Sequence, residues 1–113
     1  MAEQWKSIPD YEGIYEVSNL GNVKSKKKNL ILKPSANAKT GYLQVMLVRN
    51  SHYKMFYVHR LVAEAFIDNP NGDKCVTHLD KDKTNNKSDN LKWLSLAELA
   101  KIRRQKKEDN GSN

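Results

Sequence analysis

Cysteine and long apolar runs are nearly absent from this sequence of 113 residues. Its single cysteine, Cys75, excludes a disulfide framework and a zinc site built from several cysteines of one chain. No apolar run approaches the roughly 20 residues that a membrane-spanning helix needs, so we expect no membrane partner. The N-terminal residues MAEQWKSIPD lack a basic start followed by an apolar stretch, and we therefore expect no secretory signal peptide. These absences predict a small, soluble intracellular protein.

Basic residues outnumber acidic ones, with 20 Lys and Arg against 13 Asp and Glu, for a formal net charge of +7. Such an excess favours a polyanionic partner, most commonly nucleic acid, although it can also simply keep a small protein soluble. The charge is clustered, which favours the first interpretation. One cluster lies early in the chain and the other near its end: Lys24, Lys26, Lys27 and Lys28, and then Lys101, Arg103, Arg104, Lys106 and Lys107.

The first half of the chain has the pattern of short antiparallel strands. β-Branched and aromatic residues occur in short runs, separated by turn-forming segments such as Ser18–Asn22 and Arg49–Ser51. The strands that this pattern predicts are residues 14–17, 23–26, 30–33, 42–48 and 52–57.

From residue 58 the apolar spacing becomes helical, as Val58, Leu61 and Phe66 illustrate, and predicts a helix that ends before residue 68. Ser95 and Glu98 have the spacing of a capping box, in which each side chain bonds the other's backbone N–H at a helix start. The remaining elements predicted are a strand at 74–79, a polar loop at 80–89, a short apolar strand at 91–94 and a helix at 96–106.

The densest polar segment is residues 76–93, VTHLDKDKTNNKSDNLKW. Asp80 and Asp82 have the spacing that begins a calcium-binding loop. The rest of that pattern fails, because Asn85 stands where a tight-turn glycine is needed and Leu91 stands where a bidentate glutamate belongs. A calcium loop is therefore excluded.

The same segment resembles the HNH nuclease family. The matching residues are THLD at 77–80, KTNN at 83–86 and NLKW at 90–93, with HRLVAEAF at 59–66 as the helix that precedes them in one subgroup. Upstream, residues 5–25 follow the pattern WKxIxxYExxYxVSNxGxVxS and are similar to the nuclease-associated modular domain that accompanies these enzymes. The two resemblances cover about residues 5–98 in the order typical of the family.

This resemblance implies an α+β fold, with a small antiparallel β module followed by a ββα-metal (HNH) module that cuts DNA. His78 would be the general base, since an imidazole can accept a proton from water near neutral pH. Asn90 would brace the loop that presents His78, and Asn86 would complete the catalytic set. A divalent cation, Mg²⁺ or Mn²⁺, would stabilise charge on the scissile phosphate. The residues expected to contact DNA are Lys24, Lys26, Lys27, Lys28, Arg103, Arg104, Lys106 and Lys107.

Two departures from the family pattern concern the metal. The residue before the base histidine usually supplies an Asp or Asn oxygen, and here it is Thr77. Nine residues after the asparagine that matches Asn90, the family usually has a metal-binding Asn or His, and here it is Leu99. A leucine cannot bind a cation and a hydroxyl is a poor replacement for a carboxylate or amide oxygen. A smaller departure is Lys81, where the family often has a turn glycine.

Three substitutes for the missing ligands stay open. Asp80 lies two residues after His78 and would point to the same side of a continued strand. Glu98 is next to Leu99 on the last helix, and a partner subunit could also supply a ligand. The candidate metal positions are therefore Thr77, Asp80 and Glu98.

Several other conspicuous side chains have a plainer structural interpretation. His59 fits the start of a packed helix better than a metal ligand, and Cys75 fits the core as a small apolar residue. The aromatic residues that fit a core better than a base-stacking surface are Trp5, Tyr15, Phe66 and Trp93.

Two functions follow. The leading hypothesis is a DNA-binding, metal-dependent endonuclease, favoured by His78, Asn86 and Asn90. The alternative is a catalytically degenerate HNH-fold protein that acts as a DNA-binding regulator or as an inhibitor bound to another protein, favoured by Thr77 and Leu99. No residue distinguishes DNA from RNA, or fixes the oligomeric state.

The expected division of the chain is a modular β domain at 1–50, an HNH module at 51–107 and a disordered tail at 108–113. The family resemblance further implies a phage or other mobile-element protein, acting in the cytoplasm of a bacterial host.

Overall fold

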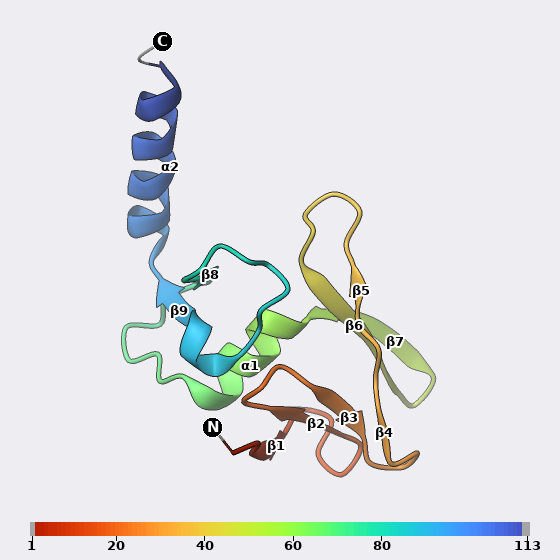
Figure 1. Cartoon of the computed structure of the whole chain (residues 1–113). Coiled ribbons are helices and arrows are strands. Elements are labelled where there is room, and N and C mark those ends of the chain that lie inside the picture. The colour runs from red at the N-terminus through yellow and green to blue at the C-terminus, as the bar shows by residue number, and fades with distance from the viewer. Residues whose placement is uncertain (1, 112–113) are drawn as a thin grey trace.

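Short alternating strands in the first half of the chain form two of the three antiparallel sheets (Figure 1). The computed structural model describes the backbone of residues 2–111 and the side chains of residues 2–104. The molecule extends 54 × 31 × 26 Å. It has the α+β fold expected from the sequence.

The first sheet has the strand order β1-β2-β3-β4. Its strands are β1 (Trp5–Ser7), β2 (Tyr15–Ser18), β3 (Val23–Ser25) and β4 (Leu30–Ile31). Val17 and Val23 face each other across β2 and β3 and are buried. In the β2–β3 turn the Ser18 hydroxyl accepts hydrogen bonds from the backbone N–H groups of Leu20 and Asn22.

The second sheet is formed by β5 (Ser35–Ala36), β6 (Leu43–Arg49) and β7 (His52–Tyr57). Val45 and Leu47 alternate with more exposed residues along β6 and are buried in the core. The turn between β6 and β7 has Asn50 and Ser51 at φ of 49° and 65°, the left-handed conformation of the tight turn expected there.

Helix α1 (Val58–Phe66) lies between the sheets and joins them in one core. Its apolar residues at helical spacing, including Leu61 and Val62, are buried against Val17, Leu47 and Leu91. Residues on both sides of position 50 thus share one core. The division into domains at that position stays a prediction.

The third sheet pairs β8 (Cys75–His78) with β9 (Leu91–Leu94). A 3₁₀ turn, η1 (Ser88–Asn90), leads into β9, and α2 (Leu96–Gly111) follows and extends away from the rest of the molecule (Figure 1). The predicted capping box forms at its start, since Ser95 N–H donates to Glu98 Oε1 and Glu98 N–H donates to Ser95 Oγ. Within residues 2–111, no helix is long and apolar enough to cross a membrane.

The structure departs from the expected elements at four strands and helices: β1, β4, β5 and α2. Strands β1 and β5 were not predicted, because both are very short and lack apolar alternation. Strand β4 ends at Ile31, two residues before the expected end. Helix α2 includes residues 108–111, which we expected to be disordered, because its Lys, Arg, Gln and Glu residues favour a helix. Residues 112–113 of that expected tail lie outside the described residues.

Candidate active site

His78 is the last residue of β8, and its side chain is buried with 6% exposed. Its Nε2 lies 2.7 Å from Oδ1 of Asn86, which comes from the following loop. An amide oxygen only accepts hydrogen bonds, so in this orientation Nε2 carries the proton and the lone pair is on Nδ1. Asn86 therefore selects which nitrogen of the imidazole can act as a base.

The loop between β8 and β9 is held closed by Asn90. Its Nδ2 donates to Asp80 Oδ1 and to the Asn85 carbonyl, both at 2.9 Å, and its Oδ1 accepts from Asp80 N–H at 3.1 Å. The Asn90 carbonyl also accepts from Leu79 N–H at 2.8 Å. One buried asparagine thus bonds both the beginning and the later part of the loop that carries Asn86.

The rings of Tyr42 and His59 contact His78 and Tyr57 packs behind them, a cluster that the sequence did not predict. The Tyr42 ring stacks on the His78 imidazole, with centroids 5.7 Å apart and an interplanar angle of 20°. His59 lies 5.1 Å from His78 and 4.7 Å from Tyr42, and Tyr57 packs against both Tyr42 and His59. Tyr42 directly precedes β6 and Tyr57 ends β7, where an aromatic residue indicates only burial, so nothing in their spacing points to the site.

His59 starts a packed helix, as the sequence suggested, but it also contacts His78. Its side chain is 6% exposed, and its Nδ1 is buried without a hydrogen-bond partner among the described residues. Burial lowers the pKa of His59 to about 4, with smaller contributions from His78 and Arg60. The ring is therefore neutral at physiological pH.

The residues around His78 do not fit the metal ion that the HNH family implies. Within the described part of the chain, no group of three or more His, Cys, Asp or Glu side chains could hold a metal ion. Glu98 is exposed and its carboxylate accepts the capping bond from Ser95, which lowers its pKa. Leu99, beside it on α2, has no donor atom.

Asp80 is also engaged within the loop. Its Oδ1 accepts hydrogen bonds from Asp82 N–H and Asn90 Nδ2, and its Oδ2 accepts from Asn85 Nδ2. The bond from Asn85, followed by those from Asp82 and Asn90, lowers the pKa of Asp80. Both oxygens of this carboxylate thus act in folding the loop.

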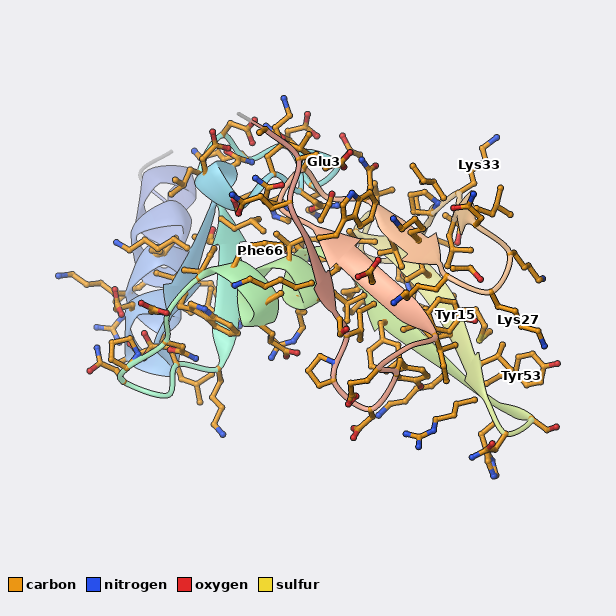
Figure 2. The ribbon with its side chains drawn as sticks, turned by 90° about the horizontal axis from the view of Figure 1, so that it is seen from below. Glu3, Tyr15, Lys27, Lys33, Tyr53 and Phe66 are labelled. Atoms are coloured by element: carbon orange, nitrogen blue, oxygen red, sulfur yellow. The ribbon has the colours of Figure 1, made fainter. Side chains whose placement is uncertain are left out.

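The two basic clusters lie at opposite ends of the molecule. Lys26, Lys27 and Lys28 are exposed on the β3–β4 turn, and Figure 2 shows Lys27 pointing away from the protein. Lys24 is engaged inside the sheet, because its Nζ lies 3.6 Å from Glu16 and 4.3 Å from the centre of the Trp5 ring. On α2 the side chains of Arg103 and Arg104 are exposed, whereas those of Lys106 and Lys107 lie outside the described side chains.

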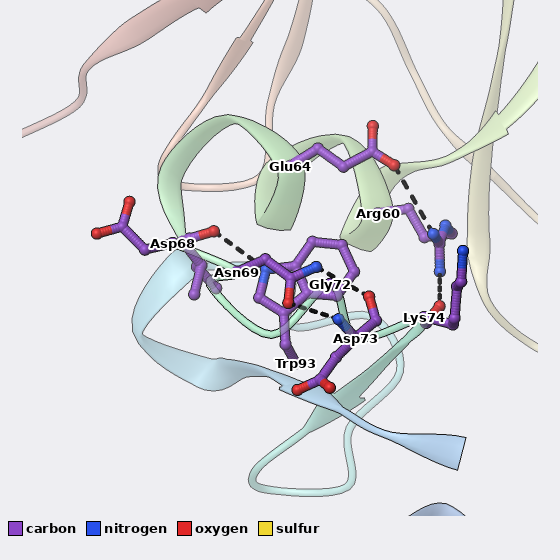
Figure 3. Close-up of a pocket in the computed structure, with 9 residues that line it drawn as sticks. Arg60, Glu64, Asp68, Asn69, Gly72, Asp73, Lys74 and Trp93 are labelled. Carbon is purple, nitrogen blue, oxygen red and sulfur yellow. Dashed lines mark hydrogen bonds and ion pairs between the residues drawn. The ribbon is translucent and has the colours of Figure 1, made fainter.

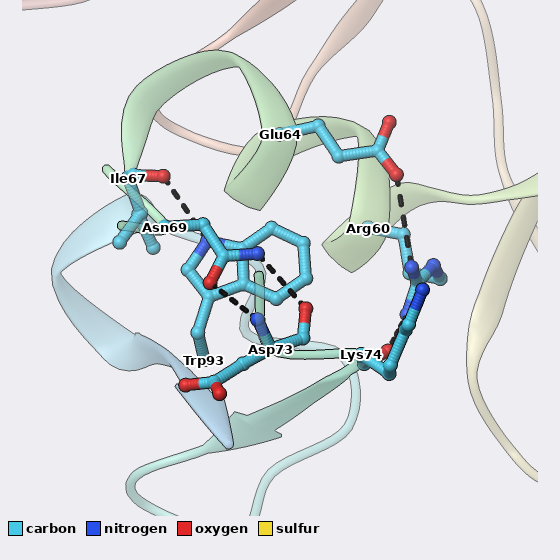
Figure 4. A network of polar contacts seen from close by, with 7 residues as sticks. All are labelled: Arg60, Glu64, Ile67, Asn69, Asp73, Lys74 and Trp93. Atoms are coloured by element: carbon cyan, nitrogen blue, oxygen red, sulfur yellow. Dashed lines mark hydrogen bonds and ion pairs between the residues drawn. The ribbon is translucent and has the colours of Figure 1, made fainter. Parts of the chain in front are cut away.

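A groove lies elsewhere, between α1 and the segment that leads to β8 (Figure 3). It has a volume of about 540 Å³, and none of the predicted catalytic residues lines it. Trp93 Nε1 donates to the Ile67 carbonyl at 3.0 Å, and Arg60 donates to the Lys74 carbonyl at 2.8 Å (Figure 4). Asn69 makes two further bonds to the backbone of Asp73. These contacts hold β9 and the segment before β8 against α1 and the residues that follow it, and they thereby help to position His78.

Comparison with known proteins now identifies the family. Residues 3–48 match the NUMOD4 motif, and residues 56–101 match the HNH endonuclease model, so the two matches account for most of the chain. The chain belongs to the HNH endonuclease family. The family membership expected from the THLD, KTNN and NLKW segments is thereby confirmed.

Relatives of this HNH protein come from a phage and from a mimivirus. It is 42% identical over 92 residues to the DNA endonuclease I-HmuI of Bacillus phage SP01, covering 81% of this chain and 52% of that protein. It is also 42% identical over 95 residues to the uncharacterized HNH endonuclease L245 of Acanthamoeba polyphaga mimivirus, covering 84% of this chain and 28% of that protein. The chain thus spans about half, or less, of these relatives.

A solved structure shares the fold of this HNH protein. The structure described as "DNA binding and cleavage by the HNH homing endonuclease I-HmuI" aligns with a TM-score of 0.78 and 39% sequence identity. The alignment covers 97% of this chain and 60% of that chain. The predicted order of a β module followed by a ββα module is therefore confirmed.

Proposed function

We propose that this chain binds DNA and places the β8–β9 loop, with His78, at the phosphodiester backbone. The similarity to a phage DNA endonuclease over most of the chain supports DNA as the partner. The exposed lysines of the β3–β4 turn and the exposed arginines of α2 supply positive charge at both ends of the molecule.

We further propose that the chain by itself cleaves DNA poorly or not at all. The observation that supports this is the state of the candidate metal donors: Thr77 and Leu99 occupy the two expected ligand positions, and Asp80 and Glu98 are engaged in hydrogen bonds of their own. Without a cation, the negative charge that develops on the phosphate is not neutralised, and an imidazole base alone does not replace that contribution. The chain is then a DNA-binding protein derived from a nuclease.

Endonuclease activity is the second candidate, and one observation favours it. The bond between His78 and Asn86 leaves Nδ1 of the imidazole as a base. In that case the missing metal ligand comes from a residue that moves when DNA binds, or from a partner subunit.

One experiment separates the two candidates. The purified chain is incubated with supercoiled plasmid and Mg²⁺ or Mn²⁺, with EDTA and His78→Ala as controls, and the same DNA is tested for gel retardation over a range of salt. We expect salt-sensitive retardation without nicking. Nicking that requires both the metal and His78 would establish the endonuclease instead, and absence of both activities would refute DNA as the partner.

A further inference from the structure

The β2–β3 turn of the N-terminal module lies directly against the loop that carries Asn86. Ser88 N–H, at the start of η1, donates to the Asn19 carbonyl of the turn at 2.8 Å, and Figure 1 shows the turn beside η1. A side chain at Gly21 would place its Cβ 3.0 Å from the Cβ of Asn86 and 3.1 Å from its backbone carbonyl. Gly21 also has φ of +89°. The two modules thus meet in van der Waals contact at Asn86.

The turn is itself held rigidly. The Glu3 carboxylate accepts hydrogen bonds from Ser18 Oγ at 2.7 Å and from Asn22 Nδ2 at 2.6 Å, and these bonds lower the pKa of Glu3. Asn19 is bonded to Gln4 through both backbone and side chain. The surface that Gly21 presents to Asn86 is therefore fixed from the N-terminal side.

We propose that Gly21 is a positioning residue for the His78 imidazole, acting through Asn86. Asn86 Oδ1 receives the Nε2 proton of His78, but Asn86 Nδ2 is buried without a partner in the described residues, so the hydrogen bonds of the amide do not fix its position alone. The packing of Gly21 against Asn86 also limits the position of the Asn86 side chain. The N-terminal module is thus part of the HNH site as well as a separate DNA-contacting element.

The inference concerns the site of the proposed function, but its test measures the imidazole and does not depend on DNA binding or cleavage. In the full-length ¹⁵N-labelled chain at mildly alkaline pH, long-range ¹H–¹⁵N spectra report the tautomer of each histidine, with His78→Gln assigning the signals. We expect His78 to have Nε2 protonated and Nδ1 bare. In Gly21→Ala we expect the two ¹⁵N shifts to move toward each other, as the tautomers mix.

Gly13 provides a matched control. It also has a positive φ, of +77°, but a Cβ there would meet nothing within 4 Å. Gly13→Ala therefore carries the same kind of backbone strain without the contact. We expect Gly13→Ala to keep the wild-type tautomer.

A second variant tests the contact if Gly21→Ala does not fold. Ser88→Pro removes the N–H that bonds to Asn19, and proline suits the position, because Ser88 begins η1 and Lys87 before it has φ of −66° and ψ of 141°. We expect Ser88→Pro to mix the tautomers of His78 as well. The proposal is overturned if the variants that fold keep the wild-type tautomer, or if Gly13→Ala changes it equally.

Discussion

Nε2 of His78 and Oδ1 of Asn86 are 2.7 Å apart in a buried setting, where His78 is 6% and Asn86 is 4% exposed. This pair joins the end of β8 to the loop that follows it. Because both polar groups are buried and paired, the contact also contributes to stability.

Removal of the amide should therefore destabilise the protein measurably. Asn86→Ala leaves His78 Nε2 buried without its acceptor, at a cost of about 1–3 kcal/mol in the free energy of unfolding. Asn85→Ala is the control, because its side chain is only half-buried and bonds to the exposed Asp80. Urea unfolding measures both. Equal, small losses for the two variants would contradict the role given to Asn86.

His59 should make stability depend on pH. Its pKa is about 4 when folded against 6.5 for an ordinary histidine, so the unfolded chain binds the proton more tightly. The folded protein therefore has its full stability above pH 6.5. As the pH falls toward 4, the free energy of unfolding decreases by at most about 3 kcal/mol. His59→Phe should flatten the dependence of the unfolding free energy on pH in this window. An unaltered profile for His59→Phe would refute the assignment.

Lys81 occupies a backbone conformation that favours glycine. Its φ is 67°, and its N–H donates to the His78 carbonyl in the turn after β8. Lys81→Gly should relieve this strain. Even with the larger conformational entropy that glycine loses on folding, the free energy of unfolding should rise by up to about 1 kcal/mol. Lys92→Gly, in the extended β9 strand, should destabilise instead. Calorimetric melting distinguishes the two, and a lower melting temperature for Lys81→Gly would contradict the prediction.

The β3–β4 turn should account for part of the salt dependence of DNA binding. If Lys26, Lys27 and Lys28 each neutralise one phosphate, their replacement by Ala should make the slope of log affinity against log salt less steep by about 2.7. Lys24→Ala should change the slope by less than the ~0.9 expected for one neutralised phosphate, since Lys24 is engaged with Glu16 and Trp5. Fluorescence anisotropy gives both slopes. An unchanged slope in the triple variant would place the DNA elsewhere.

Much of the fold could be predicted from local patterns in the sequence. The strands around Val45 and Val76, the turn at Asn50–Ser51 and the Ser95–Glu98 capping box depend on residues close together in the chain. Strands β1 and β5 could not be predicted in this way, because strands of three and two residues are too short to show an alternation of apolar and polar residues. Their pairing is decided by the neighbouring strands.

The candidate site was only partly predictable, for a related reason. The residue types at Thr77 and Leu99 already differ, without any structure, from the metal donors that the family resemblance leads us to expect. The contact of Gly21 with Asn86 depends on how segments far apart in the chain pack, and no spacing in the sequence encodes it. The hydrogen bonds of Asp80 lie within one loop, and which of its polar residues pair depends on how that loop folds.

We propose that this HNH protein keeps a base histidine, His78, but lacks the metal donors expected at positions 77 and 99. Restoring those donors with Thr77→Asp and Leu99→Asn is the most direct test, measured as the rate of nicking of supercoiled plasmid in Mg²⁺ or Mn²⁺. We predict that the wild type does not nick, that the double variant does, and that adding His78→Ala abolishes the gain. Metal-dependent nicking by the wild type at the rate of the double variant would contradict the account.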